Sequence, residues 1–242
     1  MSYFRIAVCW ATALAVATAT SAGCANARPA DASGQRATTP RGTIALATTA
    51  DFRTVFLISA ASGRVKSVRA PVGLLDLKAD LSRDGRRIAV GGLNAIWTFA
   101  RGGGATRRVV GVAGNGAAPG EPSWSPSGRE LAFTRDGDVF TVAASGKNVK
   151  KLFAGRAYAP DWSPAGDEIV FVRNPASRTG GGAIHAIRAD GRNLRSIVFG
   201  GHPDVSPDGR KVAFARRDGV YVVSIRGGRP RRVIRNAENP EW

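Results

Sequence analysis

The chain has 242 residues, of which 43% are hydrophobic and 22% are charged, and its formal net charge at pH 7 is +17. These proportions are ordinary for a globular protein. Its two cysteines, Cys9 and Cys24, lie in the N-terminal segment, which excludes disulfides, thiolate metal sites and cysteine nucleophiles from the remaining sequence. The 30 glycines and 13 prolines favour many short strands joined by tight turns.

Residues 1–27 have the features of an export signal. Arg5 is the only charged residue before an alanine-rich apolar stretch, residues 6–20, which is short for a transmembrane helix. Residues 21–24 (SAGC) resemble a lipobox, in which Cys24 would receive a lipid, although Ser21 stands where leucine is usual. Residues 25–27 (ANA) fit ordinary signal peptidase instead. We therefore expect an exported protein, periplasmic or at the cell surface, and anchored to the membrane if Cys24 is modified.

Residues 28–40 are rich in small and polar residues and predict a flexible linker before a domain that occupies residues 41–242. The positive charge would suggest nucleic acid inside a cell, but we expect no nucleic-acid partner for an exported protein. Anionic envelope polymers and lipid headgroups would be attracted by the same charge. A genome that prefers arginine, together with a need for solubility, is the alternative explanation.

A repeat organises the predicted domain. The segments LSRDGRRIAV (81–90), WSPSGRELAF (124–133), WSPAGDEIVF (162–171) and VSPDGRKVAF (205–214) align without gaps. Their shared serines, at 82, 125, 163 and 206, are spaced by 43, 38 and 43 residues. This period is typical of propeller blades made of four strands.

Each copy predicts four strands, which we name A to D. Strand A ends at the apolar residue before the serine, and the Ser-Pro-x-Gly sequence then turns the chain into strand B. Strand C is predicted at residues 96–99, 139–142, 184–187 and 220–223. Strand D usually begins with basic residues and is predicted at residues 107–110, 150–153, 194–197 and 231–234.

A fifth copy is split between the two ends of the sequence. Residues 41–46, 55–58 and 65–68 supply its strands B, C and D, and the missing strand A appears in residues 239–242 (NPEW), which match residues 159–162 (APDW). The sequence therefore predicts an all-β, five-bladed β-propeller of four-stranded blades. We expect the N- and C-terminal strands to share one blade and so close the ring.

The pattern Pro-x-Trp-Ser-Pro-x-Gly-x-x-Ile-Ala-Phe resembles the WD-like propeller repeat of TolB, the periplasmic protein of the Tol-Pal system. The resemblance covers residues 41–242, with five repeats here where the TolB family has six blades. It implies an envelope module that binds proteins or ligands.

Acidic residues precede the apolar end of strand A in four of the five copies. The five positions are occupied by Asp80, Ser123, Asp161, Asp204 and Glu241. Because strand A is innermost in a propeller, these side chains would form a ring around the axis, where a hard cation such as Ca²⁺ or a cationic ligand could bind. His202 is a further candidate for ligand binding near the mouth of the channel. Alternatively, each carboxylate accepts hydrogen bonds from turn amides or from an arginine of the next blade.

The sequence contains candidate residues for two classes of enzyme. A Ser-His-Asp hydrolase would have to use His185 or His202, but no Gly-x-Ser-x-Gly elbow is present, and Ser145 falls in a predicted C–D turn. The alternative function is a glycoside hydrolase-like enzyme that acts on envelope carbohydrate through carboxylates such as those at 161, 204 and 241. A catalytic carboxylate should occur in one copy and not in the others, whereas these carboxylates occupy the same position in several copies. We therefore expect a binding protein and not an enzyme.

Basic pairs begin three of the predicted D strands: Arg107-Arg108, Lys150-Lys151 and Arg231-Arg232. Strand D is outermost in a blade, so the pairs could form a positive wall that meets an anionic polymer. They could equally protect the exposed edge of each blade from pairing with another chain.

Overall fold

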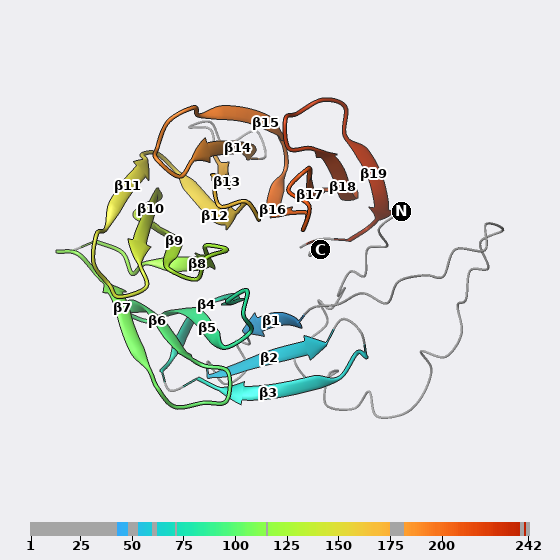
Figure 1. Cartoon of the computed structure of the whole chain (residues 1–242). Helices are drawn as coiled ribbons and strands as arrows, with labels where there is room; N and C mark the ends of the chain where they lie inside the picture. Colours follow the sequence, from blue (N-terminus) through green and yellow to red (C-terminus); the bar gives the residue numbers. More distant parts are fainter. Residues whose placement is uncertain are drawn as a thin grey trace.

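The structure of the protein is a computed structural model that describes residues 43–47, 53–59, 62–70, 72–114, 116–174, 182–237 and 240. The regular structure of these residues consists entirely of antiparallel β-strands, arranged as five blades around a central axis (Figure 1). The predicted five-bladed propeller is thereby confirmed. The predicted signal, Cys24 and the predicted linker lie outside the described residues.

The blades follow one another in chain order, and each blade except the first runs from strand A at the axis to strand D at the rim. Blade 1 contains β1 (Thr43–Ala47), β2 (Thr54–Ser59) and β3 (Val65–Arg69). Blade 2 contains β4 (Leu74–Leu81), β5 (Arg87–Gly92), β6 (Ala95–Ala100) and β7 (Arg107–Gly111). Blade 3 contains β8 (Gly120–Trp124), β9 (Glu130–Arg135), β10 (Asp138–Ala143) and β11 (Lys150–Phe153). Blade 4 contains β12 (Ala157–Trp162), β13 (Glu168–Arg173), β14 (Ala183–Arg188) and β15 (Arg195–Phe199). Blade 5 contains β16 (Gly201–Val205), β17 (Lys211–Arg216), β18 (Gly219–Ser224) and β19 (Arg231–Arg235).

The turn between strands A and B has the same construction in blades 2 to 5. Its glycine is left-handed in each copy, as the turn requires, with φ between +64° and +76° at Gly85, Gly128, Gly166 and Gly209. The buried serine hydroxyl before the turn accepts a hydrogen bond from the backbone N–H five residues later, as Ser163 does from Glu168 at 3.1 Å. The serine therefore satisfies a backbone donor that the tight turn would otherwise leave unpaired.

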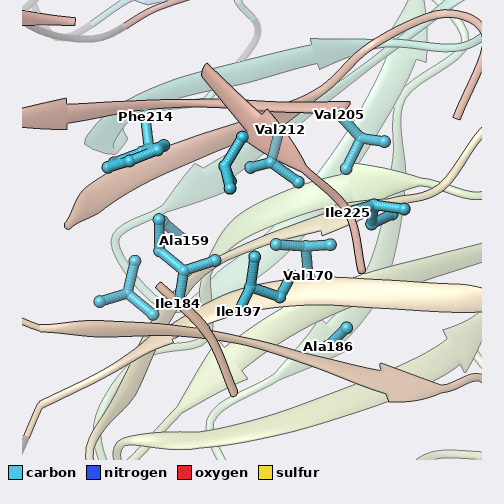
Figure 2. Packing of buried hydrophobic residues seen from close by; sticks show 11 residues of the cluster. Ala159, Val170, Ile184, Ala186, Ile197, Val205, Val212, Phe214 and Ile225 are labelled. Atoms are coloured by element: carbon cyan, nitrogen blue, oxygen red, sulfur yellow. The ribbon is translucent and has the colours of Figure 1, made fainter. Parts of the chain in front are cut away.

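Apolar residues at the end of strand A pack between neighbouring blades. The four residues at this position are Leu81, Trp124, Trp162 and Val205, and each belongs to or packs against a different hydrophobic cluster. Figure 2 shows the cluster between blades 4 and 5, where Val205 and Phe214 face Val170 and Ile184. The core of the protein is thus a series of contacts between blades, because the apolar face of a sheet can be buried only against another element.

The two ends of the propeller differ in the connections they carry. In blades 2 to 5, a backbone hydrogen bond joins the A–B turn to the C–D turn, as from Ala144 N to Arg129 O at 2.7 Å and from Ile225 N to Arg210 O at 3.0 Å. We call this end the turn face. The B–C connections and the links between blades lie at the opposite end, which we call the loop face.

One strand pairing was not predicted. Leu46 of β1 pairs with Lys78 of β4, which joins blades 1 and 2 into a single seven-stranded sheet. The strand expected to close blade 1, residues 239–242, lies outside the described residues apart from the buried Pro240. Ring closure by this strand therefore stays a prediction.

Candidate axial site

The predicted axial side chains connect each blade to the next. In three successive blades, the side chain before the apolar end of strand A accepts a hydrogen bond from the backbone N–H at that end of the following blade. The three bonds run from Trp124 N to Asp80 Oδ2 (2.6 Å), from Trp162 N to Ser123 Oγ (3.3 Å) and from Val205 N to Asp161 Oδ2 (3.0 Å). The residues thus form an ordered series around the axis, always from one blade to its successor.

Ser123 and Asp161 also bond to each other. Ser123 Oγ donates to Asp161 Oδ1 at 3.2 Å. The alternative that assigned the carboxylates to local hydrogen bonds anticipated backbone amides of a turn, whereas these amides belong to the neighbouring blade. Asp204 holds the same position on β16, and Glu241 lies outside the described residues.

Lys78 was not singled out from the sequence, although it lies two residues before Asp80 in the same strand. Its Nζ donates to the carbonyl oxygen of Pro160 at 2.7 Å. Lys78 belongs to blade 2 and Pro160 to blade 4, so this bond joins two blades that are not adjacent. The ammonium group also acts electrostatically on Asp80 and Asp161. The protein therefore supplies a cation of its own to the acidic side chains at the axis.

Burial dominates the titration of both axial carboxyls. It raises the pKa of Asp80 from 3.8 to about 6, an effect that the Trp124 amide and Lys78 oppose and the charge of Asp161 reinforces. Burial also raises the pKa of Asp161, against the stabilising influence of Lys78 and the Val205 amide. Removal of a carboxylate from water thus outweighs the favourable contacts that the ring provides.

A second set of contacts lies two residues earlier in strand A, toward the loop face. Glu121, Ala159 and His202 occupy equivalent positions and have left-handed backbones, with φ of 52°, 50° and 48°. Glu121 Oε2 accepts hydrogen bonds from Ala159 N at 2.9 Å and from Thr134 Oγ1 at 2.8 Å. Glu121 therefore also ties blade 3 to blade 4, and sequence reasoning missed it because the repeat does not conserve an acid there.

The two histidines have different environments. His202 is exposed, and its ring lies edge-on to Tyr158 of the neighbouring blade with the centroids 6.4 Å apart. His185 is half-buried in β14, where it stacks on Phe171 at 5.9 Å and its Nδ1 lies 3.0 Å from the carbonyl oxygen of Ala183. The described residues place neither imidazole beside a serine hydroxyl and a carboxylate.

No cluster of three or more His, Cys, Asp or Glu side chains within the described ranges could hold a metal ion. Calcium binding at the axis, with Asp204 and Glu241 as further ligands, stays a prediction. An added cation would compete with the Lys78 ammonium for Asp80 and Asp161. Millimolar calcium should raise the melting temperature if the site exists, since a ligand selective for the native state stabilises it.

Replacing Asp161 by alanine should be more destabilising than replacing it by asparagine. Asparagine retains an acceptor for the Val205 amide, whereas alanine leaves that amide unpaired. The difference in free energy of unfolding should be about 1–3 kcal/mol, the cost of an unsatisfied buried donor. Urea denaturation of the two variants measures it, and equal stabilities would show that the bond between the blades contributes nothing.

Comparisons with known proteins agree with the fold. A protein from Agrobacterium tumefaciens assigned as TolB superimposes with a TM-score of 0.63 at 23% identity, covering 80% of this chain and 81% of that one. TolB from Acinetobacter baumannii superimposes with a TM-score of 0.62 at 18% identity, covering 80% of this chain and 52% of that one. The fold is that of a TolB-like β-propeller.

Other solved propellers share this TolB-like fold with lower identity. One is from a nidogen/laminin complex, with a TM-score of 0.63 at 10% identity over 78% of this chain and 76% of that one. Another is an oligogalacturonate lyase in complex with manganese, with a TM-score of 0.58 at 14% identity over 76% of this chain and 60% of that one. No protein-family model matches the chain, and no curated protein matches it. The described part of the TolB-like propeller has no helix long and apolar enough to cross a membrane.

Proposed function

We propose that this TolB-like propeller is an exported scaffold of the cell envelope that binds a protein or an anionic envelope polymer and catalyses no reaction. The proposal rests on the hydrogen bonds that the axial polar side chains make between blades. Asp80, Ser123 and Asp161 accept hydrogen bonds that hold successive blades together. Side chains engaged in this way are poorly available for proton transfer, and the outer surfaces of the propeller remain for binding.

The nidogen/laminin neighbour supports a protein partner, because that propeller was solved as part of a protein complex. The proposal is tested by capturing partners from envelope extract with the purified propeller and then titrating the purified candidate against it. Saturable one-to-one binding of the same partner supports a scaffold. Turnover of an envelope component without stable binding would contradict it.

Membrane anchoring through Cys24 forms part of this proposal. The wild-type protein should incorporate labelled palmitate and sediment with membranes, and Cys24→Ser should lose both properties. Cys9→Ser, within the apolar stretch, is the matched control and should retain them. Equal labelling of the Cys24→Ser protein would rule out the anchor, and a soluble chain that begins at Arg28 would identify ordinary cleavage.

The second candidate is an enzyme acting on envelope carbohydrate. Two observations favour it: burial raises the pKa of both Asp80 and Asp161, and one structural neighbour is an oligogalacturonate lyase in complex with manganese. The test is product formation from oligogalacturonate and from envelope glycans, with and without manganese. Activity that Asp80→Asn abolishes would favour the enzyme, whereas activity that survives Asp80→Asn and Asp161→Asn would come from elsewhere.

A further inference from the structure

The turn face carries basic residues on most of its turns, and many have no acidic partner. Six of the exposed ones, which make no ion pair with any described residue, are Arg86, Arg129, Lys147, Arg192, Arg210 and Arg229. The ion pairs described on this face are Arg188–Asp190 and Arg195–Glu168. Asp84 and Asp208 also lie here, and they interact electrostatically with Arg86 and Arg210 of their own turns. Glu130 and Asp167 lie at two further A–B turns. Basic residues nevertheless outnumber acidic ones in these turns, so the turn face carries a net positive charge.

Large apolar side chains are exposed at equivalent points of the same face. Val65, Val149 and Leu194 each lie in a C–D turn at the start of strand D, and they are 52%, 45% and 45% exposed. A left-handed asparagine precedes two of them, with φ of 58° at Asn148 and 54° at Asn193. Basic residues flank every one of the three, as in Lys147-Asn148-Val149-Lys150. The other exposed large apolar residues among those described, Leu93, Val112 and Phe199, lie at the loop-face ends of their strands. What distinguishes the three on the turn face is their equivalent position and their basic neighbours.

Contacts between blades join the C–D turns of blades 3, 4 and 5. Lys150 Nζ donates to the carbonyl oxygen of Asp190 at 2.6 Å, which joins blade 3 to the C–D turn of blade 4. Arg195 Nη1 donates to the carbonyl oxygen of Ile225 at 2.6 Å, which joins blade 4 to the C–D turn of blade 5. Val149 and Leu194 are thus held on turns that are joined to each other, and Val65 lies on the same face in blade 1.

We propose that the turn face docks on a membrane surface of anionic lipids, with the basic residues against the headgroups and Val65, Val149 and Leu194 inserted between them. Interfacial binding requires this combination, since basic residues are attracted to anionic headgroups and apolar residues gain by leaving water. A soluble polyanion would use the charges but would offer nothing to the three apolar side chains.

The path of the chain supports the same orientation. Thr43, the first described residue, pairs with Ser59, and Ser59 N donates to Arg64 O in the C–D turn of blade 1. The chain therefore enters the propeller at the turn face. Residues 24–42 could span at most about 70 Å when extended. A lipid on Cys24, if present, would tether the protein on the side that we propose faces the membrane.

The experiment uses the chain from residue 28, which retains every described residue, and measures cosedimentation with vesicles of phosphatidylcholine with or without phosphatidylglycerol. Binding should require phosphatidylglycerol. Replacing Lys147 and Arg229 by alanine should weaken it roughly 30-fold, about five-fold for each basic residue near the surface. Replacing Arg217 and Arg235, exposed basic residues of the loop face, by alanine is the charge-matched control and should have a much smaller effect.

A second measurement separates a membrane from a soluble polyanion. Leu194→Trp should show blue-shifted emission on anionic vesicles but not with polyphosphate, and Val149→Ser with Leu194→Ser should weaken vesicle binding alone. Unchanged emission on vesicles, together with polyphosphate binding that the serine variants retain, would overturn the proposal in favour of a soluble polyanion. Equal losses from the Lys147/Arg229 and Arg217/Arg235 pairs would also overturn it, since binding would then follow net charge and not this face.

Discussion

Replacing Trp242 by alanine should lower the free energy of unfolding by about 3–5 kcal/mol, the usual cost of truncating a buried tryptophan. Trp124 and Trp162 pack between blades at the equivalent positions, where they are 5% and 6% exposed. The residues that surround Trp162 include Ala132 and Val139 of the preceding blade. Their counterparts in blade 5, Ala213 and Val220, are fully buried. We expect Trp242 to cover them, with Asp204 accepting a hydrogen bond from its backbone N–H as Asp161 does from Val205.

Urea denaturation measures the effect, and Trp162→Ala is the matched control because its surroundings are described. The indole N–H of Trp162 has no described partner, so its contribution comes from packing. Trp242→Phe should accordingly cost less than Trp242→Ala. Destabilisation by Trp162→Ala without any by Trp242→Ala would refute a ring closed by residues 239–242.

Replacing Asp80 by asparagine should remove a fall in stability of about 3 kcal/mol between pH 4 and pH 6.5. The pKa of Asp80 rises from 3.8 to about 6 on folding, so the folded protein holds this proton more tightly than the unfolded chain. The resulting stabilisation is fully present below pH 4 and is lost as the pH rises through 6. Asparagine does not titrate, and its side-chain oxygen still accepts from the Trp124 amide.

The measurement is the free energy of unfolding at several pH values for wild type and Asp80→Asn. Asp208→Asn is a control of opposite sign: the Ser206 hydroxyl and the Arg210 amide lower the pKa of Asp208, so its stabilising contribution is present above pH 4 and lost in acid. A pH profile for Asp80→Asn that runs parallel to wild type would show that folding does not raise the pKa of Asp80.

The sequence predicted the strands well because their determinants are local. Alternating apolar residues and the Ser-Pro-x-Gly turn identify strands B, C and D in each blade, and the glycines at 85, 128, 166 and 209 have the positive φ that the turn demands. The position of the anchors, such as Trp162 between blades, followed from the same repeat. Residues 239–242 carry the repeat equally, and their pairing is the part of the fold still to be tested.

The axial contacts could not be predicted in the same way because they depend on distances between blades. The repeat placed Asp80 and Asp161 at the axis, but the donors they meet, Trp124 N and Val205 N, are 44 residues away in each case. The bond from Lys78 to Pro160 joins residues 82 positions apart in blades that are not adjacent. Glu121 meets the Ala159 amide from a backbone with positive φ, a conformation that glutamate does not favour and that the sequence therefore does not predict.

The directed bonds from one blade to the next bear on how such a protein can change in evolution. Each repeat supplies both an acceptor for its successor and a donor for its predecessor, so a duplicated repeat brings its own complementary pair. Gain or loss of one repeat therefore need not leave the backbone amide at the end of strand A without an acceptor. The bond from Lys78 to Pro160, which joins blades that are not adjacent, is the contact that such a change would disturb.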